Sequence, residues 1–332
     1  MTSPPQASAV PAQIRLDTAT SADDAAAALV GFAFGPGAAA DAERFSVPLP
    51  SLEGPATEDW VVAKSGQIEQ SPEPDGLRIR RSADWLMGEL MVDAVRAEDI
   101  ERAACEAYTR VHAFVADSGY PHLLRMWNYF DRLNEGEGDD ERYRRFCVGR
   151  HNAIASPGFE FRLPAATVIG SRVPGLYLSF LAGRESGSQI ENPRQTSAFR
   201  YPRDYGPISP SFSRATRIGY TLLVSGTAAV VGHATQHPGD ATAQLDEIIA
   251  NLRALLDRAT QDLGWRKGSW HAQALRLYLR EERDATALAE RLRTAMCETA
   301  TSLAVMRGDI SRTDLMLEVE GVWQFRSEVS SS

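Results

Sequence analysis

Two glutamates lie two residues apart near the C-terminal end of the chain, in a run that is otherwise apolar. Glu318 and Glu320 belong to the segment from Leu315 to Val322, which has the pattern of a strand. Side chains alternate between the faces of a strand, so both carboxyl groups point to one side. Lost hydration and a neighbouring carboxylate both raise a carboxyl pKa, which makes this pair a candidate proton donor near neutral pH. An edge strand whose polar face meets water is the alternative that the spacing leaves open.

A second stretch, residues 190–210, is rich in arginine, tyrosine and proline. It holds three arginines, two tyrosines and four prolines. Proline fixes φ and so presents its neighbours in a preset geometry. Guanidinium groups bind carboxylates through paired hydrogen bonds, and tyrosine hydroxyls add uncharged donors. The stretch therefore favours a site for an anionic, carboxylated small molecule, and a rigid connector with solvated charges is the alternative.

A second basic cluster follows the acidic loop at residues 134–140. We expect Arg144 and Arg145 to neutralise that loop. Arg150 is the better functional candidate, because it follows Gly149, and glycine allows a ligand to approach the backbone closely.

The sequence gives no support for a metal or a cofactor. Among the six histidines, His233 and His237 have a spacing that would suit a metal on a helix. The flanking Gly232 and Pro238-Gly239 make a helix improbable there. No glycine-rich nucleotide motif and no serine-hydrolase motif is present. We therefore expect neither a metal nor a cofactor.

Two stretches have the same design, an amphipathic helix that ends at a glycine and precedes a strand. The spacing of apolar residues predicts helices at Ala97–Asp117 and Ala241–Asp262. Gly119 and Gly264 end them, close to half a chain length apart. Such a distance is what a duplicated α+β unit would leave, although any two amphipathic helices that end at glycine look alike. The strands expected after the helices are Leu123–Phe130 and Trp270–Leu279.

Composition limits the class of protein. With 332 residues, 43% hydrophobic and 24% charged, the chain has the composition of a globular protein of about two domains. Its net charge of -9 argues against nucleic-acid or anionic-membrane partners. Three scattered cysteines indicate no disulfide framework, and no apolar run reaches the ~18 residues of a membrane span. We expect a cytoplasmic protein with disordered ends at residues 1–13 and 328–332.

Several segments together resemble the chorismatases, enzymes that cleave chorismate. They lie in the family's order between about residues 80 and 325. The segments are Arg125–Phe130, Asn134–Gly138, Arg145–Arg150, Glu191–Gln195, Tyr201–Gly206, Val224–His233 and Asp314–Gly321.

The resemblance also implies the architecture. Residues 240–322 are similar to the end of the small RidA/YjgF fold, which is chorismate-mutase-like, with its penultimate helix and closing Glu-x-Glu strand. We therefore expect an α+β protein of two fused RidA/YjgF-like units, with mixed sheets and helices packed on one face. The N-terminal unit would span residues 14–185 and the C-terminal unit 186–327, with the active site in the cleft between them.

The chemistry of chorismate gives these motifs roles. Chorismate carries two carboxylates and an enol ether, and by the family pattern Glu318 protonates the methylene carbon of that ether while Glu320 supports it. Water then adds and pyruvate leaves. The resemblance implies substrate-binding residues, first Arg150 and Arg203, then Tyr201, Tyr205 and Arg194.

Three further positions bear on the product. Family members that form 3-hydroxybenzoate tend to carry cysteine where this chain has Ser311, and a smaller residue near Ala228 and Ala229. Both departures favour a hydrolase that forms trans-3,4-dihydroxycyclohexa-1,5-diene carboxylate and pyruvate. A lyase that forms 3- or 4-hydroxybenzoate is the alternative, and a non-catalytic RidA-like metabolite-binding protein is another. We expect a monomer, because a duplicated chain supplies within itself an interface that single-unit relatives make between subunits.

Overall fold

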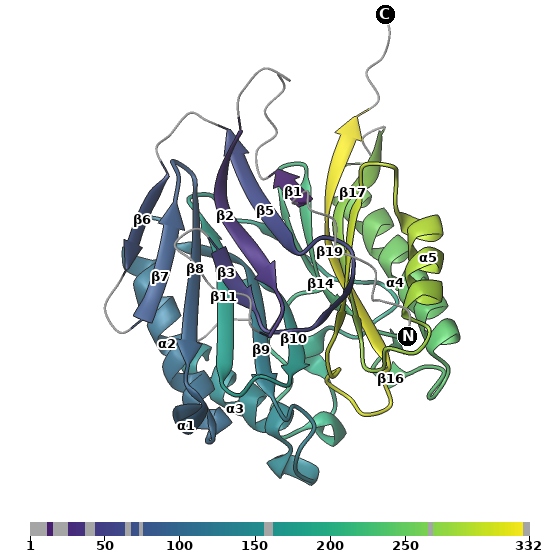
Figure 1. Cartoon of the computed structure of the whole chain (residues 1–332), viewed down its shortest axis with the longest axis horizontal. Coiled ribbons are helices and arrows are strands. Elements are labelled where there is room, and N and C mark those ends of the chain that lie inside the picture. The colour runs from purple at the N-terminus through teal and green to yellow at the C-terminus, as the bar shows by residue number, and fades with distance from the viewer. Residues whose placement is uncertain are drawn as a thin grey trace, which may run out of the picture.

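The computed structural model describes residues 12–15, 26–36, 44–63, 68–72, 76–155, 162–264 and 268–327. Two mixed β-sheets lie at its centre, and helices pack on one face of each sheet (Figure 1). The prediction of an α+β fold with mixed sheets is therefore confirmed. None of the helices in the described part of the chain is long and apolar enough to cross a membrane.

The first of the two sheets belongs to the N-terminal half. Its strand order is β10-β9-β11-β8-β7-β6. The elements of this unit are β6 (Glu69–Pro72), β7 (Leu77–Arg81), β8 (Trp85–Val92), α1 (Ala94–Ala97), α2 (Ile100–Asp117), β9 (His122–Asp131), α3 (Arg142–Ile154), β10 (Ala165–Ser171) and β11 (Leu176–Gly183).

The second sheet belongs to the C-terminal half, in the order β12-β13-β14-β19-β17-β18-β4. Its elements are β12 (Ser188–Ile190), β13 (Ala215–Ile218), β14 (Thr221–Thr227), the hairpin β15 (Val230–Val231) and β16 (Ala234–Thr235), α4 (Ala241–Asp262), β17 (Gly268–Leu279), α5 (Ala285–Met296), β18 (Ser302–Arg307) and β19 (Leu317–Ser327).

The two sheets repeat one topology. The order β7-β8-β11-β9-β10 in the first sheet matches β13-β14-β19-β17-β18 in the second, and in each only the last pair is parallel. The two predicted helices, α2 and α4, occupy equivalent places in these units. Gly119 and Gly264 follow them with φ of 81° and 71°, a conformation that glycine adopts without strain. The duplication expected from the sequence is present.

A third sheet, the four-stranded N-terminal sheet, lies outside the repeat and has the order β1-β5-β2-β3. Its strands are β1 (Ala12–Arg15), β2 (Ala26–Phe34), β3 (Arg44–Val47) and β5 (Thr57–Ala63), and β4 (Ser51–Glu53) joins the edge of the second sheet. The span 14–185 thus contains this additional sheet as well as one copy of the repeated unit. The division at residues 185 and 186 falls between β11 and β12, and we retain it as a proposal.

The predicted disordered ends lie largely outside the described residues. Residues 1–11 and 328–332 are not among the described residues. Ala12 and Gln13, which the prediction included, begin β1 and pair in parallel with β5.

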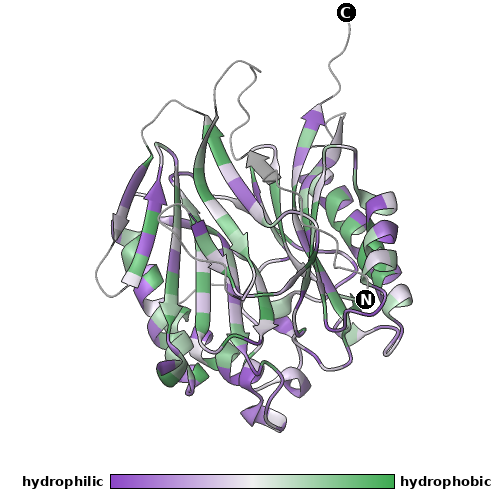
Figure 2. Ribbon diagram, in the orientation of Figure 1, coloured by the Kyte–Doolittle hydropathy of each residue, from purple (hydrophilic) through white to green (hydrophobic). Residues whose placement is uncertain are grey.

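Apolar residues form two cores. One lies between the first sheet and helices α2 and α3. The larger one joins the other face of the first sheet, the N-terminal sheet, the second sheet and helices α4 and α5. Phe32, Trp60 and Trp127 meet there with ring centroids 5.3 to 6.4 Å apart. In Figure 2 the peripheral helices alternate between hydrophilic and hydrophobic stretches, as expected for helices with one buried face.

Candidate active site

The strand that carries both glutamates lies in the middle of the second sheet. β19 pairs with β14 on one side and β17 on the other. Glu318 is only 6% exposed and Glu320 only 2%. The alternative of an edge strand whose polar face meets water is therefore wrong.

Glu318 is a buried carboxyl group without a hydrogen-bond partner among the described residues. Burial, followed by the charge of Glu320, raises the pKa of Glu318 to about 8, although Arg125 and Arg214 act in the opposite direction. At neutral pH this side chain therefore carries its proton. The direction of this shift agrees with the expectation from the sequence.

Gly226 makes room for this carboxyl group. The pairing of β14 with β19 is irregular between Val224 and Thr227, and Gly226 lies inside that interruption. A Cβ atom at Gly226 would lie 1.7 Å from Oε1 of Glu318. The carboxyl group thus packs directly against the backbone of the neighbouring strand, which only glycine permits.

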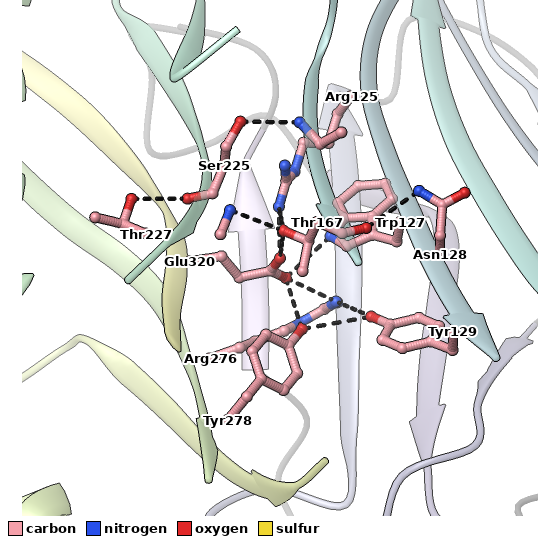
Figure 3. Close-up of polar contacts among 12 residues, drawn as sticks. Arg125, Trp127, Asn128, Tyr129, Thr167, Ser225, Thr227, Arg276, Tyr278 and Glu320 are labelled. Atoms are coloured by element: carbon pink, nitrogen blue, oxygen red, sulfur yellow. Dashed lines mark hydrogen bonds and ion pairs between the residues drawn. The ribbon is translucent and has the colours of Figure 1, made fainter. Parts of the chain in front are cut away.

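Glu320 has the opposite environment, because its carboxylate is surrounded by donors (Figure 3). Arg125 donates to Oε2 at 2.5 Å, and Thr167 donates to the same oxygen. The donors to Oε1 are Trp127 at 3.0 Å, Tyr278 at 2.9 Å and Arg276 at 3.2 Å. These donors come from β9 and β10 of the first unit and β17 of the second, so Glu320 joins the two units.

A second carboxylate, Glu58 of β5, completes this buried cluster. Arg276 pairs with Glu58 at 2.5 Å as well as with Glu320 at 3.2 Å. Its guanidinium carbon also lies 4.8 Å from the centre of the Phe32 ring. The cluster therefore holds β19, β17 and the N-terminal sheet in one arrangement and keeps the charge of Glu320 in place beside Glu318.

A cavity of about 270 Å³ opens beside Glu318. Both units line it, with Glu141, Tyr143 and Arg144 from the first and the remaining residues from the second. The cavity thus lies between the two units, where the active site was expected. The predicted residues that line it are Glu318, Tyr201, Tyr205, Ala228 and Ser311.

Other predicted residues lie elsewhere. Arg203 does not line the cavity and donates two hydrogen bonds, of 2.9 and 2.5 Å, to the carboxylate of Asp139. Arg194 pairs with Glu247 at 2.6 Å. In both cases a nearby carboxylate holds the guanidinium group, and neither residue lines the cavity beside Glu318, so their role in substrate binding stays a prediction.

Ala229 and Arg150 do not line this cavity either. Ala229 is wholly buried in the larger core, one residue away from the cavity-lining Ala228. Arg150 lines a different cavity, on the helical side of the first unit. Glu320 does not line the 270 Å³ cavity, but its charge acts on the pKa of Glu318, and its role in supporting the proton donor stays a prediction.

The arginines that do line the cavity are Arg144, Arg214 and Arg312. Arg214 is 5% exposed and donates to the hydroxyl oxygen of Tyr201 at 2.8 Å. The guanidinium carbon of Arg312 lies 4.0 Å from the centre of the Tyr205 ring. Sequence reasoning missed Arg214 and Arg312, although Arg214 follows the proline-rich stretch by only a few residues.

Arg144 and Arg145 have the acidic neighbours that were expected. Within the acidic loop, Arg145 approaches Asp140 at 3.9 Å and Arg144 approaches Asp139 at 3.9 Å. Arg144 approaches Glu141 at 3.2 Å, and it also lines the cavity. Its role therefore extends beyond neutralising the acidic loop.

Comparison with known proteins identifies the family. The family description "Chorismatase FkbO/Hyg5-like, N-terminal" matches residues 58–182. A chorismatase of Streptomyces rapamycinicus is 35% identical over 293 residues, which cover 83% of this chain and 86% of the relative. The chain belongs to the chorismatase family. The resemblance found in the sequence is confirmed, and as a chorismatase the chain is an enzyme.

Further relatives agree with this assignment to the chorismatases. A 3-hydroxybenzoate synthase of Streptomyces hygroscopicus is 33% identical and covers 84% of this chain and 84% of its own. A crystal structure of a chorismatase matches with a TM-score of 0.76 at 30% identity, covering 89% of this chain and 92% of its own.

Proposed function

We propose that this chorismatase hydrolyses chorismate to pyruvate and trans-3,4-dihydroxycyclohexa-1,5-diene carboxylate, with Glu318 as the proton donor. The main observation behind this proposal is a buried carboxyl group with a pKa of about 8 beside a cavity that three arginines help to line. Names of relatives support chorismate as the substrate.

The enol ether reacts only after protonation of its methylene carbon. Glu318 gives its proton to that carbon, which leaves a carboxylate on Glu318 and an oxocarbenium ion on the carbon that carries the ether oxygen. Water adds to this cation and returns a proton to Glu318. In the resulting hemiketal the bond between the pyruvyl carbon and the ether oxygen breaks; the hydroxyl group loses its proton and becomes the keto group of pyruvate, and the departing ether oxygen gains a proton and becomes a hydroxyl group of the ring product.

The surrounding charges suit these steps. At neutral pH a carboxyl group with a pKa of about 8 is largely protonated and still acidic enough to donate. Arg214 and Arg312 are placed to bind the carboxylates of the substrate, because both guanidinium groups line the cavity. The carboxylate formed on Glu318 after donation stabilises the adjacent cation.

The lyase alternative has one observation in its favour. The 33% identical relative from Streptomyces hygroscopicus is named a 3-hydroxybenzoate synthase. Ser311 and Ala228, the positions on which the product prediction rests, both line the cavity beside Glu318. The lyase reaction consumes no net water and leaves an aromatic ring with one hydroxyl group, whereas the hydrolase reaction consumes one water and leaves a non-aromatic ring with two hydroxyl groups.

Incubation of the purified protein with chorismate tests the proposal. We expect pyruvate and a non-aromatic dihydroxy acid in equal amounts, measured by an enzymatic pyruvate assay and by the mass and absorbance of the ring product. An aromatic hydroxybenzoate would establish the lyase instead. Binding of chorismate in a calorimeter without any pyruvate would reject catalysis and support a metabolite-binding protein.

A further inference from the structure

A second cavity, of about 380 Å³, lies in the first unit. The segment Pro210–Phe212 separates it from the cavity beside Glu318. Pro210 and Phe212 line that first cavity, and Ser211 between them lines the second. Helices α2 and α3 supply other parts of its wall, and exposed residues such as Pro121 form its rim. The second cavity is therefore distinct from the proposed active site and is reachable from the surface.

Arg150 is the notable group in its wall. The side chain is 1% exposed, and none of its three guanidinium nitrogens meets the distance and angle of a hydrogen bond with the described residues, so the nearby Tyr108 hydroxyl is at most a weak, neutral partner. The hydroxyl of Ser211, in the same wall, is also buried without a partner there. Because a guanidinium group stays charged in proteins and burial of an unpaired charge is costly, a partner for Arg150 is missing.

The neighbours of Arg150 supply no negative charge to pair with it. The rings of Phe146 and Tyr108 lie 5.3 and 5.9 Å from its guanidinium carbon, which offsets only part of the cost. Burial raises the pKa of the Tyr108 hydroxyl and of the Cys147 thiol, so both stay neutral at physiological pH.

The whole cavity has a positive balance. Arg150 and Arg162 line it, whereas no aspartate or glutamate does so among the described residues. Burial, followed by the charge of Arg162, lowers the pKa of His112 in the same wall, so His112 adds no charge at neutral pH. By contrast, the cavity beside Glu318 has four acidic residues together with its three arginines.

The remaining wall is largely apolar, with Val115, Leu123, Met126 and Leu163 among its residues. One buried cation in such a wall suits a ligand with one negative charge and an apolar body. We propose that this cavity binds a small organic monocarboxylate, such as an aromatic acid, whose carboxylate pairs with Arg150. The proposal does not rest on the reaction proposed above.

A crystal of the protein soaked with 4-bromobenzoate locates the ligand by the anomalous signal of bromine. We expect a bromine peak in this cavity, with the carboxylate within about 2.7–2.9 Å of the Arg150 guanidinium. Water alone against Arg150, or bromobenzoate only beside Arg214, would overturn the proposal.

Titration calorimetry with benzoate tests the same site in solution. We expect Arg214→Met to retain one benzoate site and Arg150→Met to lose it, and we expect neutral benzamide to bind at least about tenfold more weakly. Ala153 lines the cavity from α3, so Ala153→Phe fills it and gives a second test if Arg150→Met fails to fold. Unchanged benzoate binding in Ala153→Phe, or in a folded Arg150→Met, would contradict the proposal.

Discussion

Glu318 and Glu320 share one face of one strand, yet their surroundings give them different roles. Glu320 accepts hydrogen bonds from donors of both units, whereas Glu318 has no partner among the described residues. Glu320 forms ion pairs with Arg125 and Arg276, whereas burial without donors favours the protonated acid at Glu318. The two carboxyl groups therefore divide into a fixed negative charge and a proton donor, as pairs of catalytic carboxyl groups often do.

The pH profile of kcat/KM reports this division. Because only protonated Glu318 can donate, we expect kcat/KM for pyruvate release to fall about tenfold per pH unit above a pKa of about 8. Glu320→Gln removes a charge that raises the Glu318 pKa, so the falling limb should move to lower pH. Glu58→Gln is the matched control, since it removes a carboxylate of the same cluster that does not act on the Glu318 pKa. Equal shifts in both variants would contradict the assignment.

Arg214 and Arg203 form a second matched pair. Arg214 lines the cavity, so Arg214→Met should raise KM for chorismate about 10- to 100-fold, the usual cost of one charge-assisted hydrogen-bond partner. Arg203→Met removes only a contact to Asp139 outside the cavity and should leave KM within about twofold. Steady-state kinetics decide the matter, and the reverse result would restore the assignment that the sequence suggested.

The glutamates and the arginines differ in how far the sequence could predict them. The paired glutamates were predictable, because strand alternation is a local property. Which arginine faces the cavity was not, because Arg203 turns toward Asp139, a residue 64 positions away in the chain. Local spacing contains no information on such a partner.

At the level of elements, the site depends on how β14 passes β19. Gly226 lies in the irregular part of this pairing and is in contact with the Glu318 carboxyl group. The sequence predicted β19 as a strand from its apolar run. It did not indicate the interruption, because the need for glycine arises from the side chain of the opposite strand.

Gly226→Ala tests this close approach. The new methyl group would overlap the carboxyl group of Glu318 and displace it, so we expect kcat to fall at least about 100-fold while the protein stays folded. Gly183→Ala is the control, since its methyl group would mainly meet the end of the Leu124 side chain. Circular dichroism confirms folding, and a Gly226→Ala variant with normal kcat would show that the contact is not needed.

Helices were the most predictable elements. The ranges of α2 and α4 follow from apolar residues at helical spacing, and α4 was predicted with the bounds it has in the structure. The four-stranded N-terminal sheet gives only a weak periodic signal in the sequence, because its strands are short and separated by turns. Its contribution to the buried cluster, through Glu58, was therefore not foreseen.

At the level of the whole molecule, the repeat places two sheets so that each contributes to one buried polar cluster. Arg125 and Trp127 of the first unit bind Glu320 of the second. A contact of this kind, made within one chain, removes the need for a second copy of the protein.

We accordingly expect a monomer in solution. Light scattering coupled to gel filtration should give a mass near the 36.3 kDa of the chain at micromolar concentration. A stable mass two or three times larger would show that copies of the chain associate, and would contradict this expectation.

The central claim is that the Glu318 carboxyl group protonates the enol ether. The most direct measurement compares pyruvate release from chorismate by the wild-type protein and by Glu318→Gln, which keeps the shape of the side chain but cannot donate this proton. We predict that kcat falls about 100- to 10,000-fold or more in a variant with unchanged circular dichroism and thermal melting. Release of pyruvate by a folded Glu318→Gln protein with the kcat of the wild-type protein would contradict the account.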